Sequence, residues 1–112
     1  MENAMNREMT ESTGNVYRDI GVKDPDSMFR KAELVSGIQD AIEARGWTQR
    51  QAAEALGMSQ PRLSRMLRGQ FHGISETRLL RCLTILGRDV RIVVIAPRTT
   101  NAGPGDIQLV FA

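Results

Sequence analysis

The stretch from Gly57 to His72 has a residue composition that could bind a polyanion. It carries arginines and glutamines but no acidic residue. Arginine offers a planar fork of N–H groups to phosphate or guanine, and glutamine offers both a donor and an acceptor to a base edge. If Gln60, Arg62 and Arg65 lie on an exposed helix face, they form a surface suited to phosphates and base edges.

The residues before this stretch predict a short helix that starts at Thr48 and ends at Gly57. Thr48 is a good N-cap, and Gln51 three positions later completes a capping box. The small side chains that follow allow a second helix to pack closely; they are Ala52, Ala53 and Ala55, with Leu56 beside them. Gly57 can adopt the left-handed conformation that ends a helix without a Cβ clash. A sharp turn is therefore expected at Gly57.

A second short helix is predicted directly after this turn. Ser59 is its cap, and Pro61 falls in the first turn, where a missing N–H is harmless. Apolar residues follow at helical spacing and should face inward: Leu63, Met66 and Leu67. The remaining side chains then face solvent or a ligand; these are Gln60, Arg62, Ser64, Arg65 and Arg68. Two capped helices joined by a glycine turn predict a helix-turn-helix.

Further helices are expected on both sides of this pair. One begins at Asp24-Pro25 and ends at Gly46, with an inward set of Met28, Leu34, Val35, Ile38, Ala41 and Ile42. Trp47 should pack into the bundle. The other begins at the capping residue Ser75 and runs to Gly87, with Cys82 on its apolar face. The predicted fold class is mainly α, a four- to five-helix bundle with one C-terminal β element.

That element is the run from Asp89 to Ala96, which is rich in β-branched residues and stops at Pro97. A single strand leaves its backbone groups unpaired, so it needs a partner. The partner is either the alternating run Asp106–Ala112 or the same strand of a second subunit. We favour a homodimer that forms through Val90, Ile92, Val93 and Val94. Two-fold pairing would place two recognition helices on a palindromic DNA site, with half-sites about 34 Å apart.

Length and charge indicate one domain with an uneven charge distribution. We divide the chain into a flexible tail over residues 1–14, a DNA-binding domain with its strand over 15–96, and a loop with a possible second strand over 97–112. Residues 1–27 hold six acidic and three basic residues, whereas residues 28–112 hold twelve basic and seven acidic ones. The basic part thus coincides with the helix-turn-helix, as nucleic-acid binding requires.

Other functions find little support in the residues. The single histidine and single cysteine give no metal-ligand pattern, and no phosphate-cradling glycine motif occurs. We therefore expect no catalytic residue, no metal and no cofactor. An RNA-binding module is possible on charge alone, but few aromatic residues are available for stacking. No stretch approaches the roughly 20 apolar residues of a membrane span, and we expect a cytoplasmic protein.

The helix-turn-helix residues resemble those of the Cro and repressor proteins, the XRE family, and most closely its HigA-like antitoxin branch. The resemblance covers residues 16–96 and includes Thr48-Gln49, Ala52-Ala53, Gly57, Ser59-Gln60-Pro61, Leu63-Ser64, Arg68-Gly69 and residues 75–87. It implies a lambda-repressor-like fold. The antitoxin branch is indicated by residues 15–21 and by the strand at residues 89–94.

The residues and the resemblance together give a set of candidate DNA contacts: Gln49, Ser59, Gln60, Pro61, Arg62, Ser64, Arg65, Arg68 and Gln70. Two of these residues have an alternative role: Gln49 could cap its own helix, and Ser64 could pack against the bundle. His72, just beyond the set, is either an ordinary loop residue or a contact to the DNA backbone. The resemblance also implies a RelE-like or HigB-like toxin partner, which would contact Val16, Tyr17 and Ile20. The alternative is a plain helix-turn-helix transcription factor without a toxin.

Overall fold

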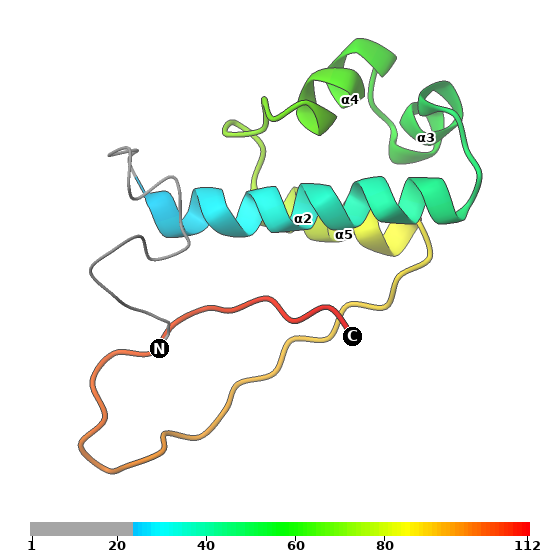
Figure 1. Cartoon of the computed structure of the whole chain (residues 1–112). Helices are drawn as coiled ribbons and strands as arrows, with labels where there is room; N and C mark the ends of the chain where they lie inside the picture. The colour runs from blue at the N-terminus through cyan, green and yellow to red at the C-terminus, as the bar shows by residue number, and fades with distance from the viewer. Residues whose placement is uncertain (1–23) are drawn as a thin grey trace.

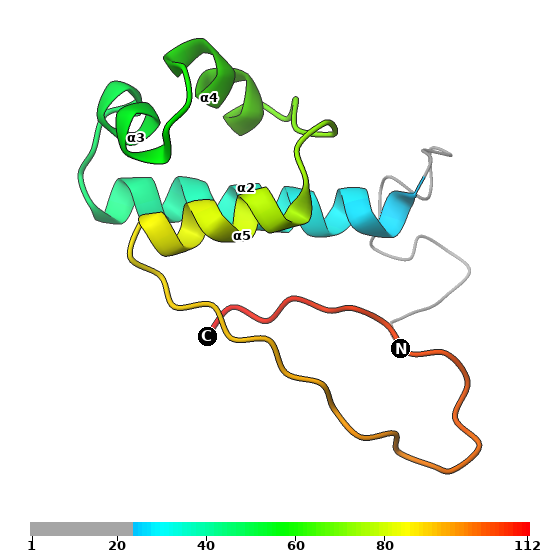
Figure 2. The same cartoon turned by 180° about the vertical axis from the view of Figure 1, so that it is seen from behind.

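A computed structural model describes residues 24–112 of the chain. Its four helices are α2 (Pro25–Ala44), α3 (Gln49–Leu56), α4 (Gln60–Leu67) and α5 (Glu76–Ile85). Helices α2 and α5 lie side by side, and α3 and α4 lie on one side of this pair (Figures 1 and 2). The chain after α5 runs on the opposite side. The mainly α part of the predicted fold class is confirmed.

The ends of α3 are formed by the residues that the sequence indicated. The Thr48 hydroxyl accepts a hydrogen bond from the Gln51 amide at 3.1 Å, and the Gln51 side-chain oxygen accepts one from the Thr48 amide at 2.9 Å. Gly57 ends the helix in the left-handed region, with φ of 70°. Because two orphan amides are satisfied within four residues, the start of α3 is fixed by local sequence.

Serine caps start the next two helices. The Ser59 hydroxyl accepts from the Arg62 amide at 3.2 Å, and the Ser75 hydroxyl accepts from the Arg78 amide at 3.0 Å. Helix α5 ends at Ile85, two residues before the predicted end at Gly87. Gly87 still turns the chain, with φ of 93°. Both predicted caps are confirmed.

The core lies between the α2–α5 pair and the helix-turn-helix. Its most deeply buried large side chains come from all of these elements except α3: Leu34, Ile38, Leu63, Met66, Leu79 and Cys82. Helix α3 contributes the small buried Ala52 and Ala53 with Leu56. Burial raises the pKa of the Cys82 thiol, as expected for a core cysteine. Met28, predicted to face inward, is half-buried at the edge of this core.

Polar contacts hold α2 against α5 at two places, one near each end of the pair. The Arg30 guanidinium donates to both carboxylate oxygens of Glu76, at 2.8 and 3.1 Å, and the Ser27 hydroxyl donates to the same carboxylate at 2.8 Å. The hydrogen bond from Arg30 lowers the pKa of Glu76. At the other end, Arg45 donates to the Leu86 carbonyl at 3.1 Å and lies over the half-buried ring of Trp47. These contacts fix the platform that carries α3 and α4.

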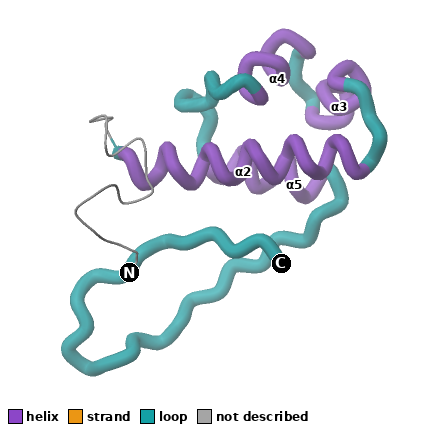
Figure 3. The backbone as a smooth tube through the Cα atoms, in the orientation of Figure 1, coloured by secondary structure: helices purple, strands orange, loops and turns teal. Residues whose placement is uncertain are grey.

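The predicted strand is not confirmed. Residues 24–112 contain no β-strand, and the chain from 88 to 112 runs as an extended loop (Figure 3). The backbone from 89 to 97 makes no hydrogen bond within the described chain, so the pairing with residues 106–112 is not formed. Residues 106–112 instead approach α2, where Leu109 packs against the core. An isolated strand has no ladder partner, and pairing between two subunits stays a prediction.

Candidate nucleic-acid interface

Helix α4 separates its apolar and polar side chains cleanly. Leu63 and Met66 are fully buried against the core, and Leu67 is half-buried. The predicted contacts Ser59, Gln60, Pro61, Arg62, Arg65 and Arg68 are exposed on or beside the same helix. Ser64 is half-buried, which favours its alternative role in packing. Because its inner face is fixed by packing, α4 presents the outer set rigidly.

The arginines of α4 have no partner within residues 24–112. The side chains of Arg62, Arg65 and Arg68 make no hydrogen bond and no ion pair there. By contrast, Arg30 and Arg45 are held by Glu76 and by the Leu86 carbonyl. An arginine without an acidic partner can bind a DNA phosphate, and this binding releases counterions from the DNA. The charges on α4 are therefore available to a ligand, whereas those of Arg30 and Arg45 serve the fold.

The first turn of α3 carries further exposed polar side chains. The capping box uses Gln51, so the side chain of Gln49 makes no hydrogen bond within the described residues, and its alternative capping role is not observed. Arg50 beside it is also exposed and unpaired there. The sequence analysis did not include Arg50. Arg50 lies in the first turn of a helix, where the free backbone N–H groups attract anions. This position could have identified it as a candidate phosphate contact.

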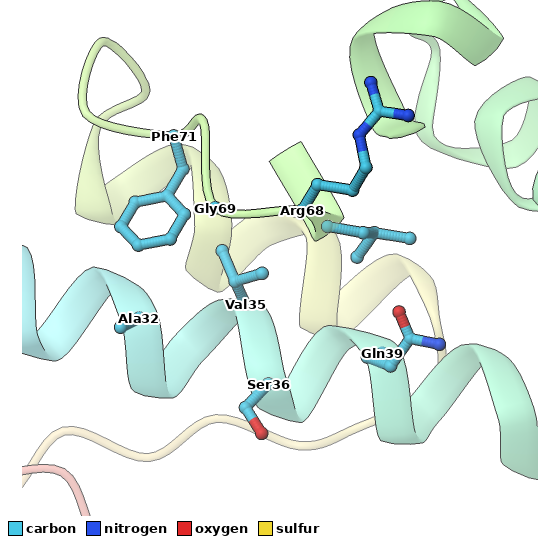
Figure 4. A pocket seen from close by; sticks show the side chains of 8 residues that line it. Ala32, Val35, Ser36, Gln39, Arg68, Gly69 and Phe71 are labelled. Carbon is cyan, nitrogen blue, oxygen red and sulfur yellow. The ribbon is translucent and has the colours of Figure 1, made fainter. Parts of the chain in front are cut away.

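The chain leaves α4 through a tight glycine turn. Gly69 has φ of 107°, and the amide of Gln70 returns to the Arg65 carbonyl at 3.0 Å, which holds exposed Gln70 beside the helix end. A pocket of about 390 Å³ separates this turn from α2. Val35, Gln39 and buried Phe71 contribute to its lining, and the Arg68 side chain extends out of the pocket and away from α2 (Figure 4).

The loop that follows is tied to α2. The Lys31 ammonium group donates to the His72 carbonyl at 2.8 Å, while the His72 side chain is exposed.

The predicted toxin contacts lie outside the described residues; they are Val16, Tyr17 and Ile20. The predicted tail over residues 1–14 lies outside them as well. None of the helices in residues 24–112 is long and apolar enough to cross a bilayer.

The capped helix pair, its glycine turn and its exposed basic second helix define a helix-turn-helix DNA-binding protein. Residues 16–95 match a family model described as a helix-turn-helix domain, and the chain belongs to this family. A solved structure described as an XRE-family transcriptional regulator is 29% identical, with a TM-score of 0.71 over 80% of this chain and 99% of that one. None of the curated proteins matches this chain significantly. The chain is a helix-turn-helix DNA-binding protein whose fold is similar to that of this regulator.

Proposed function

We propose that the chain is a sequence-specific transcriptional repressor that binds a palindromic operator as a homodimer and has no enzymatic activity. The observation that carries this proposal is the exposed, unpaired set of Gln60, Arg62 and Arg65 on a capped helix. In proteins of this architecture the second helix of the motif enters the major groove, where arginine and glutamine read base edges. Gln49, Arg50 and Arg68 would then contact the backbone phosphates beside the groove.

The dimer is proposed to form through Val90, Ile92, Val93 and Val94. These four side chains are apolar, yet they are 37%, 82%, 67% and 94% exposed. The backbone between 89 and 97 is also without hydrogen bonds in the described chain, so it can pair with another extended segment. A second copy supplies an identical segment, and a two-fold arrangement would present two recognition helices to the two half-sites.

A mobility-shift titration of the full-length chain on its own promoter tests the DNA-binding surface. The Arg62→Ala/Arg65→Ala double variant should lose at least 1 to 3 kcal/mol of specific binding, roughly 5- to 150-fold in Kd, and should remain folded. Arg81→Ala is the matched control, because Arg81 is exposed on α5 and lies outside the motif. Equal binding by the double variant and the control would disprove the assignment of α4.

We further propose that the chain is a HigA-like antitoxin that covers a RelE-like or HigB-like toxin with the segment containing Val16, Tyr17 and Ile20. The support is the sequence resemblance and the acidic excess of residues 1–27. A toxin that cleaves RNA must present positive charge, which an acidic segment complements. The alternative is a plain transcription factor without a toxin.

Co-expression with a small basic protein encoded by a neighbouring reading frame separates the two alternatives. The Tyr17→Ala/Ile20→Ala variant of the full chain should lose copurification and growth rescue while its operator binding is unchanged. Ser12→Ala serves as the control, because Ser12 is uncharged and precedes the proposed contact residues. If the double variant copurifies and rescues growth as well as the unaltered chain, the toxin interface lies elsewhere or is absent.

A further inference from the structure

Helix α2 carries a glycine at its centre, where glycine disfavours the helix about fivefold relative to alanine. A Cβ atom built on Gly37 would lie 2.7 Å from Cε2 and 3.3 Å from Cζ of the Phe111 ring. The first of these distances is shorter than real carbon contacts allow. The missing side chain of Gly37 therefore provides the space that the edge of the Phe111 ring occupies.

This contact attaches the end of the chain to the bundle. Residues 106–112 run along the α2–α5 pair on the side away from α3 and α4 (Figures 1 and 2). Leu109 is half-buried and packs against the core, whereas Val110 between the two contacts is 86% exposed. Phe111 is 56% exposed, and it is one edge of its ring that meets Gly37, while Leu109 is the side chain that packs against the core.

The segment between α5 and this attachment is held at both ends. We use the name C-terminal arm for residues 89–105. At its start, the Arg88 amide donates to the Leu83 carbonyl at 2.9 Å. At its far end, Leu109 packs against the core and the edge of the Phe111 ring lies at Gly37. The arm includes the proposed dimer contact, so its attachments determine how that contact is oriented relative to α4.

We propose that Phe111, seated at Gly37, is a positioning residue that holds the C-terminal arm and thereby sets the separation of the two recognition helices in the dimer. This inference rests on the proposed function. Without the seat, Leu109 alone attaches the far end of the arm to the bundle, so the arm is held less firmly. Two bundles joined by flexible chains still bind, but their relative orientation and their effective concentration for the second half-site decrease.

The first test is a double-mutant cycle on the stability of the full chain. In the Phe111→Ala background, Gly37→Ala has free space and should raise the folding equilibrium constant up to about fivefold. In the unaltered background the same change must displace the ring edge, so the gain should be smaller. The Gly37 Hα resonances report the ring directly, because a neighbouring aromatic ring shifts them. An identical effect of Gly37→Ala in both backgrounds, with no shift of these resonances in Phe111→Ala, would overturn the contact.

The second test measures binding to operators whose half-sites are moved apart in steps of one base pair. The unaltered chain should prefer one spacing, and Phe111→Ala should lose about three- to tenfold in affinity there while the preference flattens. Phe111→Tyr keeps the ring and should restore the preference, whereas Val110→Ala is the matched control and should leave it unchanged. The dimer should persist in all variants.

The outcomes distinguish this inference from the proposed function. A Phe111→Ala variant with the spacing preference of Val110→Ala would overturn the positioning role and leave the DNA-binding function standing. If the unaltered chain binds no operator at any spacing, the proposed function fails and the positioning role fails with it. Binding to a single half-site should be equal in all variants, because α4 lies on the opposite side of the bundle from Phe111.

Discussion

At the scale of single residues, the arginines of this chain fall into two groups that the sequence alone does not separate. Arg30 and Arg45 hold α2 against α5, whereas Arg62, Arg65 and Arg68 make no ion pair within residues 24–112. Glu76, the partner of Arg30, lies 46 residues away along the chain, so no local sequence pattern predicts the pair. The free group on α4 was predictable, because no acid lies within helical reach of it.

The Arg30–Glu76 pair predicts a pH dependence of stability. Hydrogen bonding to Arg30 lowers the pKa of Glu76 below its ordinary value of 4.5, so the ionised carboxylate stabilises the fold above that pH. The contribution is lost as the pH falls through the lower pKa of the folded state. Glu76→Gln should reduce the free energy of unfolding by about 1 kcal/mol at pH 7, and the difference from the unaltered chain should shrink below pH 4.5.

Urea titrations between pH 3 and pH 7 measure this difference. Glu54→Gln is the control, because Glu54 is an exposed carboxylate of α3 without an ion pair in the described residues. It should change the free energy of unfolding by less than about 0.5 kcal/mol. A Glu76→Gln variant as stable as this control at pH 7 would show that the ion pair contributes nothing to the fold.

At the scale of elements, the turn between α3 and α4 depends on one backbone conformation. Gly57 has φ of 70°, and a Cβ atom there would meet nothing within 4 Å, so alanine would introduce backbone strain without a clash. Gly57→Ala should destabilise the fold by about 1 to 2 kcal/mol. Gly73→Ala is the matched control, since its Cβ also has open space but its φ is not positive.

Thermal and urea unfolding should therefore show that the two substitutions change the free energy of unfolding by different amounts or in opposite directions. Gly73→Ala should be neutral or stabilise the chain by up to about 1 kcal/mol, because alanine restricts the unfolded chain. Operator binding should weaken in Gly57→Ala alone, since the angle between α3 and α4 depends on this turn. Equal losses in the two variants would mean that the left-handed turn has no special energetic role.

The elements also show where sequence patterns succeed and where they do not. Capping boxes, serine caps and glycine turns are formed within four residues, so α3, α4 and the start of α5 could be predicted closely. The strand at residues 89–96 has the right residues for a strand, but strand formation requires a second segment. The Gly37–Phe111 contact does not follow from periodicity, because it joins residues that are far apart along the chain.

At the scale of the whole molecule, the proposed dimer depends on an arm that contributes little to the bundle. Val93 is 67% exposed, and its backbone makes no hydrogen bond in the described chain. Val93→Pro should therefore leave the bundle folded, but it removes a donor from any ladder between two arms. Sedimentation should show a dimer for the unaltered chain and a monomer for this variant, with weaker operator binding.

Thr100→Pro provides the matched control for this experiment. The Ala102 amide donates to the Thr99 carbonyl at 3.4 Å, which places Thr100 at the second position of a turn, where proline is favoured. This variant should remain dimeric. A dimeric Val93→Pro variant would mean that a different surface joins the two copies.

The exposed arm also affects the behaviour of the chain before it finds a partner. A run of β-branched residues with unpaired backbone groups is the kind of segment from which sheet aggregates grow. Two features of the sequence restrain this growth: the charge of Arg91 interrupts the run, and Pro97 closes it beside Arg98. We expect these residues to limit aggregation of newly made chains at high concentration while leaving the arm free to pair with a single copy in the proposed dimer.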